Sequence, residues 1–176
     1  VETGVNISGA NAQIGDVLIM SGTMGDHGVA VLSARENLQF ETDLQSDVAP
    51  LNHLVAVMMV AGEIHVLRDP TRGGVATTLN EIASQSKVGI ELLETALPVK
   101  PQVRAACEML GFDPLNIANE GKLLAIVKAA DAESILSAMR KTKYGEEACI
   151  IGKVIETKSP QVRLRTAIGG TRLIDM

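Results

Sequence analysis

Two adjacent glycines, Gly73 and Gly74, end the segment DPTRGG, which stands between a short apolar run and a stretch with helical spacing. At a strand-to-helix junction, paired glycines let backbone N–H groups approach an anion where the helix dipole is positive. Arg72 would add a bidentate donor for phosphate or carboxylate. The spacing fits neither GxxxxGK[ST] nor GxGxxG, so the known nucleotide motifs do not apply. The structural alternative is a tight connection in which the glycines only permit close packing and Asp69 or Thr71 caps the helix.

A second polar group, Asn119, Glu120 and Lys122, directly precedes an apolar run at 123–127. Loops at the ends of core strands often face ligands. Glu120 is a candidate general base, a role that requires a partly desolvated carboxylate with a pKa raised toward neutrality. Lys122 would oppose this shift by stabilising the charge. The alternative is an ordinary turn with a solvated Glu/Lys pair.

Asp26 and His27 lie between two glycines just after a predicted strand. Histidine is a natural acid, base or phosphate contact near neutral pH. A capping or turn role for Asp26 is the alternative.

The histidines and cysteines do not indicate a metal site. His27, His53 and His65 show no ligand spacing with each other or with Cys107 and Cys149, so we expect no bound metal. His53 and His65 are interpreted as structural. Both cysteines fall in apolar patterns, where a free cysteine usually behaves as a small buried hydrophobe rather than a nucleophile.

Composition limits the class of protein. The 176 residues, 46% of them hydrophobic, can bury one core. Aromatic residues make up 2%, which excludes stacking on exposed bases, and a net charge of -5 disfavours binding to a phosphate backbone. Two cysteines give no disulfide framework, and the longest apolar run, at 54–61, is too short for a membrane span, so we expect a cytoplasmic protein.

Periods of 2 and 3.6 residues alternate along the chain, which predicts a mixed β-sheet flanked by helices, an α/β (α+β) layered fold. The Gly/Asn-rich start, residues 1–14, reads as a linker, and residues 15–176 as one domain. Strands are expected at 16–21, 64–67, 88–92, 123–127, 148–155 and 162–165, with a final short one after Gly170. Helices are expected at 29–35, from Pro50 to Gly62, after Gly74, at 101–111 and at 132–139 behind the N-cap candidate Asp131.

Taken together, four segments closely resemble the HypE family of hydrogenase-maturation proteins. They are GDVLIMSGTMGDHGVAVLSARE, RDPTRGGVATTLNEIA, LPVKPQVRAACEMLGFDPLNIANEGK and the IGG-TR-L-ID pattern near the C-terminus. The match is specific because the GDHG, DPTRGG and ANEGK segments occur in order and at family-like spacing. The family is related to aminoimidazole ribonucleotide synthetase, selenophosphate synthetase and thiamine-phosphate kinase, which pair an N-terminal ATP-binding domain with a C-terminal α/β domain. This sequence resembles the second domain.

The resemblance implies an ATP-dependent dehydration. A carbamoyl group on a C-terminal cysteine is activated by phosphoryl transfer and loses phosphate, leaving a thiocyanate that supplies the cyanide ligands of the iron in [NiFe] hydrogenase. Glu120 would then be the base, and Arg72 with the amides of Gly73 and Gly74 would stabilise phosphate or an oxyanion.

The resemblance further implies several contacts. Residues that would bind the tail are Asp26, His27, Asp69, Asn119 and Lys122. ATP and Mg would be bound mainly by the N-terminal domain, and the partners would be the carbamoyltransferase HypF, the HypC–HypD complex and a second copy of the intact protein.

Two departures from the family pattern lead us to expect that the chain alone is inactive. It ends in Ile174-Asp175-Met176 rather than in the family's Pro-Arg-Ile-Cys tail, and it shows no phosphate loop in place of the N-terminal domain. The rival hypothesis is a non-catalytic scaffold that docks HypF and the HypC–HypD complex. A sibling enzyme acting on a purine-pathway amide or on selenide is the third.

Overall fold

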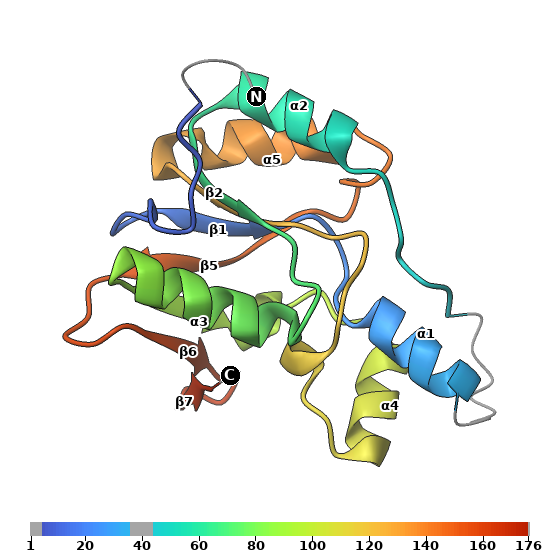
Figure 1. Ribbon diagram of the computed structural model, residues 1–176. Coiled ribbons are helices and arrows are strands. Elements are labelled where there is room, and N and C mark those ends of the chain that lie inside the picture. The colour runs from blue at the N-terminus through green and yellow to red at the C-terminus, as the bar shows by residue number, and fades with distance from the viewer. Residues whose placement is uncertain (1–4, 36–43, 176) are drawn as a thin grey trace.

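The middle of the molecule is a seven-stranded mixed sheet, which the computed structural model describes for residues 5–35 and 44–175 (Figure 1). The strand order is β2-β4-β1-β5-β3-β6-β7, and among the strand pairs of the described residues only β3–β6 is parallel. The strands are β1 Val17–Met20, β2 Ile64–Arg68, β3 Gly89–Leu93, β4 Leu124–Val127, β5 Cys149–Ile155, β6 Gln161–Arg165 and β7 Thr171–Ile174. The expected mixed sheet with flanking helices is confirmed.

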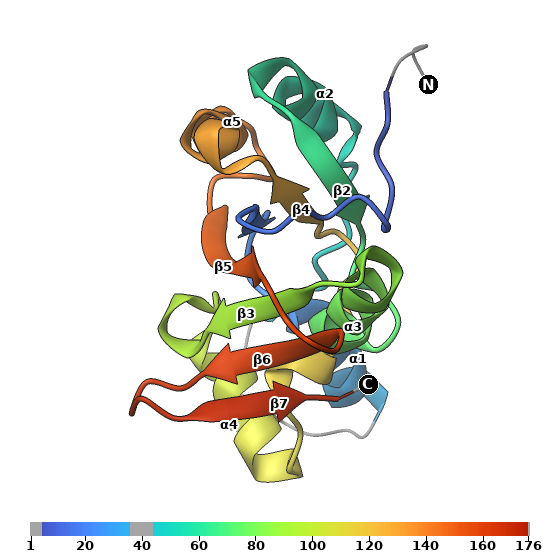
Figure 2. The same cartoon turned by 90° about the vertical axis from the view of Figure 1, so that its left-hand side faces the viewer.

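Helices pack on both faces of this sheet (Figure 2). They are α1 Asp26–Arg35, α2 Asn52–Ala61, α3 Gly74–Ser86, α4 Pro101–Leu110 and α5 Ala132–Arg140. Three 3-10 turns are added, at Glu94–Ala96, Pro114–Asn116 and Ala129–Asp131. Within the described residues, no helix is both long and apolar enough to cross a membrane.

Strands β1 and β4 are apolar along their whole length, and helices cover the sheet on both sides of them. In β4, Leu124 and Ile126 belong to the core under α3, whereas Ala125 and Val127 belong to the core under α2 and α5. Successive side chains of a strand point to opposite faces, so a strand covered on both sides reads as a continuous apolar run.

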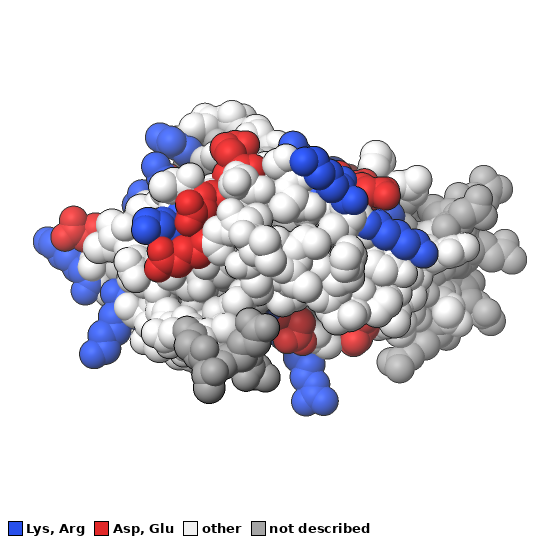
Figure 3. All heavy atoms as spheres, turned by 90° about the horizontal axis from the view of Figure 1, so that it is seen from above, with Lys and Arg blue, Asp and Glu red and all other residues white. Residues whose placement is uncertain are grey.

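Helix α2 carries no Lys, Arg, Asp or Glu, and it packs beside α5 on one face of the sheet. Leu54 and Met58 are its buried residues, whereas Val60 is 90% exposed. Seen from that side, the centre of the surface is free of charged side chains (Figure 3). The expected core stripe of this helix is therefore confirmed, with apolar surface left over on its outer side.

Helices α1 and α4 form a smaller unit beside the sheet, at the lower right of Figure 1. Val29, Val103, Ala106, Cys107 and Ile117 make its core. Helix α1 begins at Asp26, earlier than the expected Val29. An acidic residue in the first turn is favourable beside the positive end of the helix dipole, which accounts for the earlier start.

The side chains expected to cap α5 and α3 form hydrogen bonds with other groups instead. Asp131 stands at the N-cap of α5, but its carboxylate accepts the backbone N–H of Glu63 at 2.9 Å instead of capping its own helix. Before α3 the N-cap is Gly73, and the side chain of Asp69 accepts the hydroxyl of Thr71. Capping by Asp69 or Thr71 is therefore wrong, because the two side chains satisfy each other.

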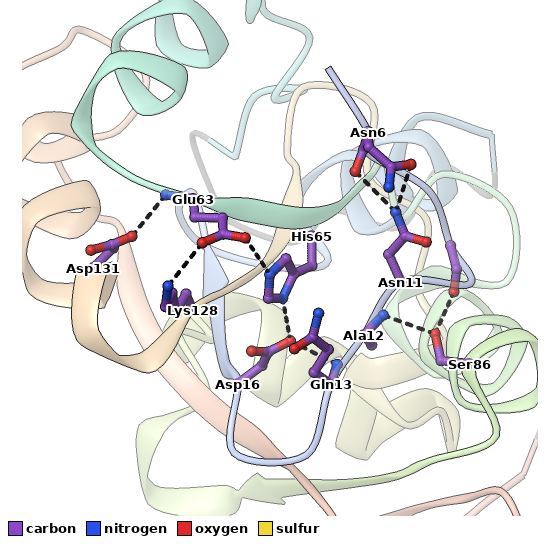
Figure 4. Close-up of polar contacts among 11 residues, drawn as sticks. Asn6, Asn11, Ala12, Gln13, Asp16, Glu63, His65, Ser86, Lys128 and Asp131 are labelled. Carbon is purple, nitrogen blue, oxygen red and sulfur yellow. Dashed lines mark hydrogen bonds and ion pairs between the residues drawn. The ribbon is translucent and has the colours of Figure 1, made fainter. Parts of the chain in front are cut away.

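The described part of the N-terminal segment, residues 5–16, packs on the domain. The backbone N–H of Ser8 bonds to the carbonyl of His65 in β2, and Ser86 at the end of α3 donates to Gly9 and accepts from Ala12 (Figure 4). The expected linker thus lies against edge strand β2 over the part that the structure describes. Its connection to an upstream domain stays a prediction.

His65 of β2 contacts two carboxylates, that of Asp16 in this segment and that of Glu63 just before the strand (Figure 4). Its Nδ1 lies 2.7 Å from Asp16 and its Nε2 lies 3.3 Å from Glu63. Burial by itself lowers the pKa of His65, but the hydrogen bonds and negative charges of Asp16 and Glu63 outweigh burial and raise it above the ordinary 6.5. Carboxylates accept hydrogen bonds only, so they favour the doubly protonated ring. The structural role expected for His65 is confirmed.

Leu79 of α3 is completely buried against the sheet, so we expect Leu79→Ala to be strongly destabilising. The lost contacts and the cavity should lower the free energy of unfolding by about 2–5 kcal/mol. Leu173→Ala is the control: that side chain is 57% exposed, and its removal should cost about 0.5 kcal/mol or less. Urea denaturation of the 176-residue chain measures both, and equal losses would contradict the assigned core.

The raised pKa of His65 makes stability depend on pH with a definite sign. The free energy of unfolding that protonated His65 contributes is fully present below the pKa of the unfolded residue, about 6.5. It is lost as the pH rises through the higher pKa of the folded residue. We therefore expect the stability advantage over His65→Gln to shrink from about pH 6 to about pH 8. Exposed His53, changed to Gln, is the control for the loss of an imidazole outside this contact. Parallel profiles for wild type and His65→Gln in urea titrations would refute this.

Candidate active site

Strand register brings three loops to one end of the sheet. Strand β4 is antiparallel to both of its neighbours, and its first residue, Leu124, pairs with Met20 at the end of β1 and with Arg68 at the end of β2. The ends of β1 and β2 and the start of β4 therefore lie at the same end of the sheet. The GDHG, DPTRGG and ANEGK segments begin or end there, so segments distant in sequence become neighbours.

Asn119 connects these loops. It is completely buried, its Oδ1 accepts the N–H of Gly25 at 2.8 Å, and its Nδ2 donates to the carbonyls of Pro70 and Ile117 at 3.1 and 3.0 Å. Its backbone N–H also bonds to Pro70. A buried amide satisfied in this way fixes its partners relative to one another. Contact of Asn119 with a bound tail stays a prediction.

The paired glycines open α3 as expected. Gly73 takes a left-handed conformation with φ 71° at the N-cap, and Gly74 is the first helical residue. Gly74 is buried, and a Cβ there would overlap the carbonyl oxygens of Leu115 and Ile117. Close packing of the helix start on the stretch before Asn119 thus requires glycine. Anion binding by these amides stays a prediction.

Arg72 and Glu120 are both exposed, and they stand on the two loops that Asn119 joins. Asp69 is exposed and Lys122 half-buried on the same loops. A general base with a raised pKa needs partial removal from water, and this chain leaves Glu120 open to solvent. Any desolvation of the Glu120 side chain must therefore come from atoms outside the described residues.

Asp26 and His27 differ in environment although they are adjacent. Asp26 is buried, and its Oδ2 accepts from the hydroxyl of Thr23 at 2.6 Å and from the ammonium of Lys100 at 2.7 Å. His27 is half-buried, with Nδ1 2.8 Å from the hydroxyl of Ser46. The structure therefore places Asp26, buried at the start of α1, in an ion pair with the partly exposed Lys100, and His27 nearer the surface. Their tail-binding roles stay predictions.

Asp47 is a residue that the sequence analysis missed. Its Oδ1 accepts the backbone N–H groups of Glu120 and Gly121 at 3.0 and 3.3 Å. A Ser-Asp pair shortly before the expected helix start at Pro50 is an available sequence signal, since Ser and Asp favour turns and caps. That signal does not indicate contact with a loop more than seventy residues away.

Neither cysteine is poised for nucleophilic chemistry. Burial raises the pKa of the Cys107 thiol in α4 and that of the half-buried Cys149 thiol in β5. The reactive form is the thiolate, which a raised pKa disfavours at neutral pH. Across the part of the chain that the structure describes, no cluster of three or more His, Cys, Asp or Glu could hold a metal ion.

Comparison with known proteins shows close relatives. Carbamoyl dehydratase HypE from Cupriavidus necator is 58% identical over 176 residues, which cover 99% of this chain and 50% of that protein. Among solved structures, a HypE–HypF complex superposes with a TM-score of 0.95 at 49% identity, covering 99% of this chain and 57% of the matched one. HypE in complex with ATP gives a TM-score of 0.93 at 48% identity, covering 97% and 53%.

The likeness to HypE expected from the sequence is thus confirmed, and the chain spans about half the length of the curated relatives it matches. The model of the AIR synthase related protein, C-terminal domain, matches residues 13–165. This agrees with the mixed sheet and its helices on both faces. The chain therefore belongs to the family of the AIR synthase related protein, C-terminal domain.

Proposed function

We propose that this chain is the C-terminal half of a HypE-type carbamoyl dehydratase that makes the cyanide ligands of [NiFe] hydrogenase. The observation that carries the proposal is the meeting of the Arg72 and Glu120 loops at one end of the sheet. In this division, residues 1–14 link an N-terminal ATP-binding domain to the α/β domain at 15–176. The intact protein is a cytoplasmic homodimer.

The substrate is a carbamoyl group, S–C(=O)–NH2, on a cysteine of the C-terminal tail. Cys107 and Cys149 do not fit that role because both lie within the fold. Phosphoryl transfer from ATP to the carbamoyl oxygen, with loss of one nitrogen proton, gives an imidate. Loss of the second nitrogen proton and cleavage of the C–O bond give S–C≡N and phosphate.

Each site residue has a role in this sequence of steps. Glu120 takes a nitrogen proton as phosphate leaves. The Arg72 guanidinium and the amides of Gly73 and Gly74 stabilise charge on the phosphoryl group or on the oxygen. His27, Asp26, Asp69, Asn119 and Lys122 shape the tail channel, Asp26 and Asn119 from within the fold.

Support for ATP and for a partner comes from relatives. HypE has been solved in complex with ATP and in complex with HypF. The proposal places ATP and Mg mainly in the N-terminal domain, and HypF with the HypC–HypD complex as partners. The HypE–HypF complex also favours the second candidate function, in which this domain is a docking scaffold and the chemistry belongs to the other half.

Replacing Glu120 by Gln in the intact protein separates the two functions. If Glu120 is the base, conversion of the carbamoylated tail to thiocyanate should slow by about 10²–10⁴-fold, the usual contribution of such a group. The rate is measured by mass spectrometry of the tail. Glu133→Gln, an exposed change on α5, is the control and should keep the normal rate. A normal rate for Glu120→Gln would favour the scaffold.

The proposal also predicts that the isolated 176-residue chain does not hydrolyse ATP, because the nucleotide-binding groups belong to the other half. Phosphate release, measured with the intact protein as positive control, should stay at background. Robust turnover by the isolated chain would contradict this division of roles.

A further inference from the structure

Residues 44–50 belong to no helix or strand, and they contact the loop that carries Glu120. Two consecutive side chains make the contacts. Ser46 bonds to the Nδ1 of His27 at 2.8 Å, and Asp47 accepts the N–H groups of Glu120 and Gly121. This segment is thus anchored both to α1 and to the loop that carries the proposed base.

The backbones also approach closely at this point. Gly121 is buried, and a Cβ on it would overlap the carbonyl oxygen of Asp47 and lie 2.6 Å from the backbone nitrogen of Ala49. Only glycine permits such an approach. The Glu120–Gly121 peptide is therefore confined by main-chain packing as well as by the Asp47 carboxylate.

Hydrogen bonds to an ionised acceptor are stronger than neutral ones, and two of them from consecutive amides fix the peptide between them. The other carboxylate oxygen of Asp47 is less favourably placed. Asp47 Oδ2 is buried and has no hydrogen-bond partner within the described structure. A buried acceptor left unpaired is unfavourable for stability, and such exceptions call for another explanation. The explanation that we draw is that Asp47 fixes the peptide of Glu120 and Gly121.

We propose that Asp47 is a positioning residue for Glu120: its carboxylate holds the 120–121 peptide so that the Glu120 side chain starts from a fixed point at the site. This rests on the proposed function, in which Glu120 takes the nitrogen proton. Asp47 acts through the backbone of that loop and does not touch the substrate. Displacing a reacting group by about 1 Å can cost on the order of 10²-fold in rate.

The test compares Asp47→Ala and Asp47→Asn in the intact protein with the carbamoylated tail and ATP as substrates. Alanine removes the acceptor, so kcat should fall by about 10- to 100-fold while KM for the tail and for ATP stays within about 3-fold. Asparagine keeps an oxygen that can accept both N–H groups, so it should restore kcat to within about 3-fold of wild type.

Asp131→Ala is the matched control, because the Asp131 carboxylate accepts the N–H of Glu63 at 2.9 Å in the same manner at the start of α5. It should lose stability without losing kcat. If Asp47→Ala does not fold, Asp47→Glu takes its place: it keeps the charge but displaces the acceptor by one methylene, so kcat should again fall with KM retained.

A double variant decides whether Asp47 works through Glu120. Combining Asp47→Ala with Glu120→Gln should be no slower than Glu120→Gln alone, since a positioning residue has nothing left to position. Multiplied losses, an unchanged kcat for Asp47→Ala, or a raised KM without loss of kcat would each overturn the inference while the proposed function stands. A normal rate for Glu120→Gln itself would overturn both.

Discussion

The buried amide of Asn119 is the interaction on which the site depends. Its three hydrogen bonds join the turn after β1, the turn after β2 and the stretch before β4. Each of these segments is irregular, and an irregular backbone placed in the interior needs partners for its polar groups. One side chain with both donor and acceptor ends satisfies all three at once. Removing it would take the partner from the N–H of Gly25 and from the carbonyl of Ile117, at about 1–3 kcal/mol for each group, whereas the carbonyl of Pro70 keeps its bond to the backbone N–H of Asn119.

The loops can meet at Asn119 because the sheet is covered on both faces and its strands are fixed relative to one another. Helix α3 packs on one side of β4, and α2 with α5 pack on the other, so the central strands have one stable register. A slip by one residue would exchange the two buried faces of every strand. The ends of β1 and β2 are therefore held level with the start of β4, and the loops that continue from them share one edge.

Much of the fold could be predicted from local pattern, since apolar periodicity and turn residues act over a few neighbours. Each expected helix and strand occurs, including the glycine-led start of α3, but α1 begins at Asp26 instead of Val29 and the 3-10 turns were not expected. The individual polar contacts could not be predicted in this way. Asp69 was a candidate cap and bonds to Thr71 instead, and Asp131 leaves its own helix to reach the backbone of Glu63. A short polar side chain can hydrogen-bond to several nearby groups, and the tertiary structure decides which of these groups lies within reach.

The sequence by itself determined the elements, the mixed α/β class and the candidate loops around Arg72 and Glu120, because residue type and spacing set local conformation. Tertiary structure alone decided which loops meet, that Asp26 is buried in an ion pair while Glu120 is exposed, and that Asp47 holds the Glu120 peptide. Those outcomes follow from strand register and from contacts between residues more than seventy positions apart, which no local pattern records. Loop geometry is thus a property of the assembled sheet rather than of any one segment.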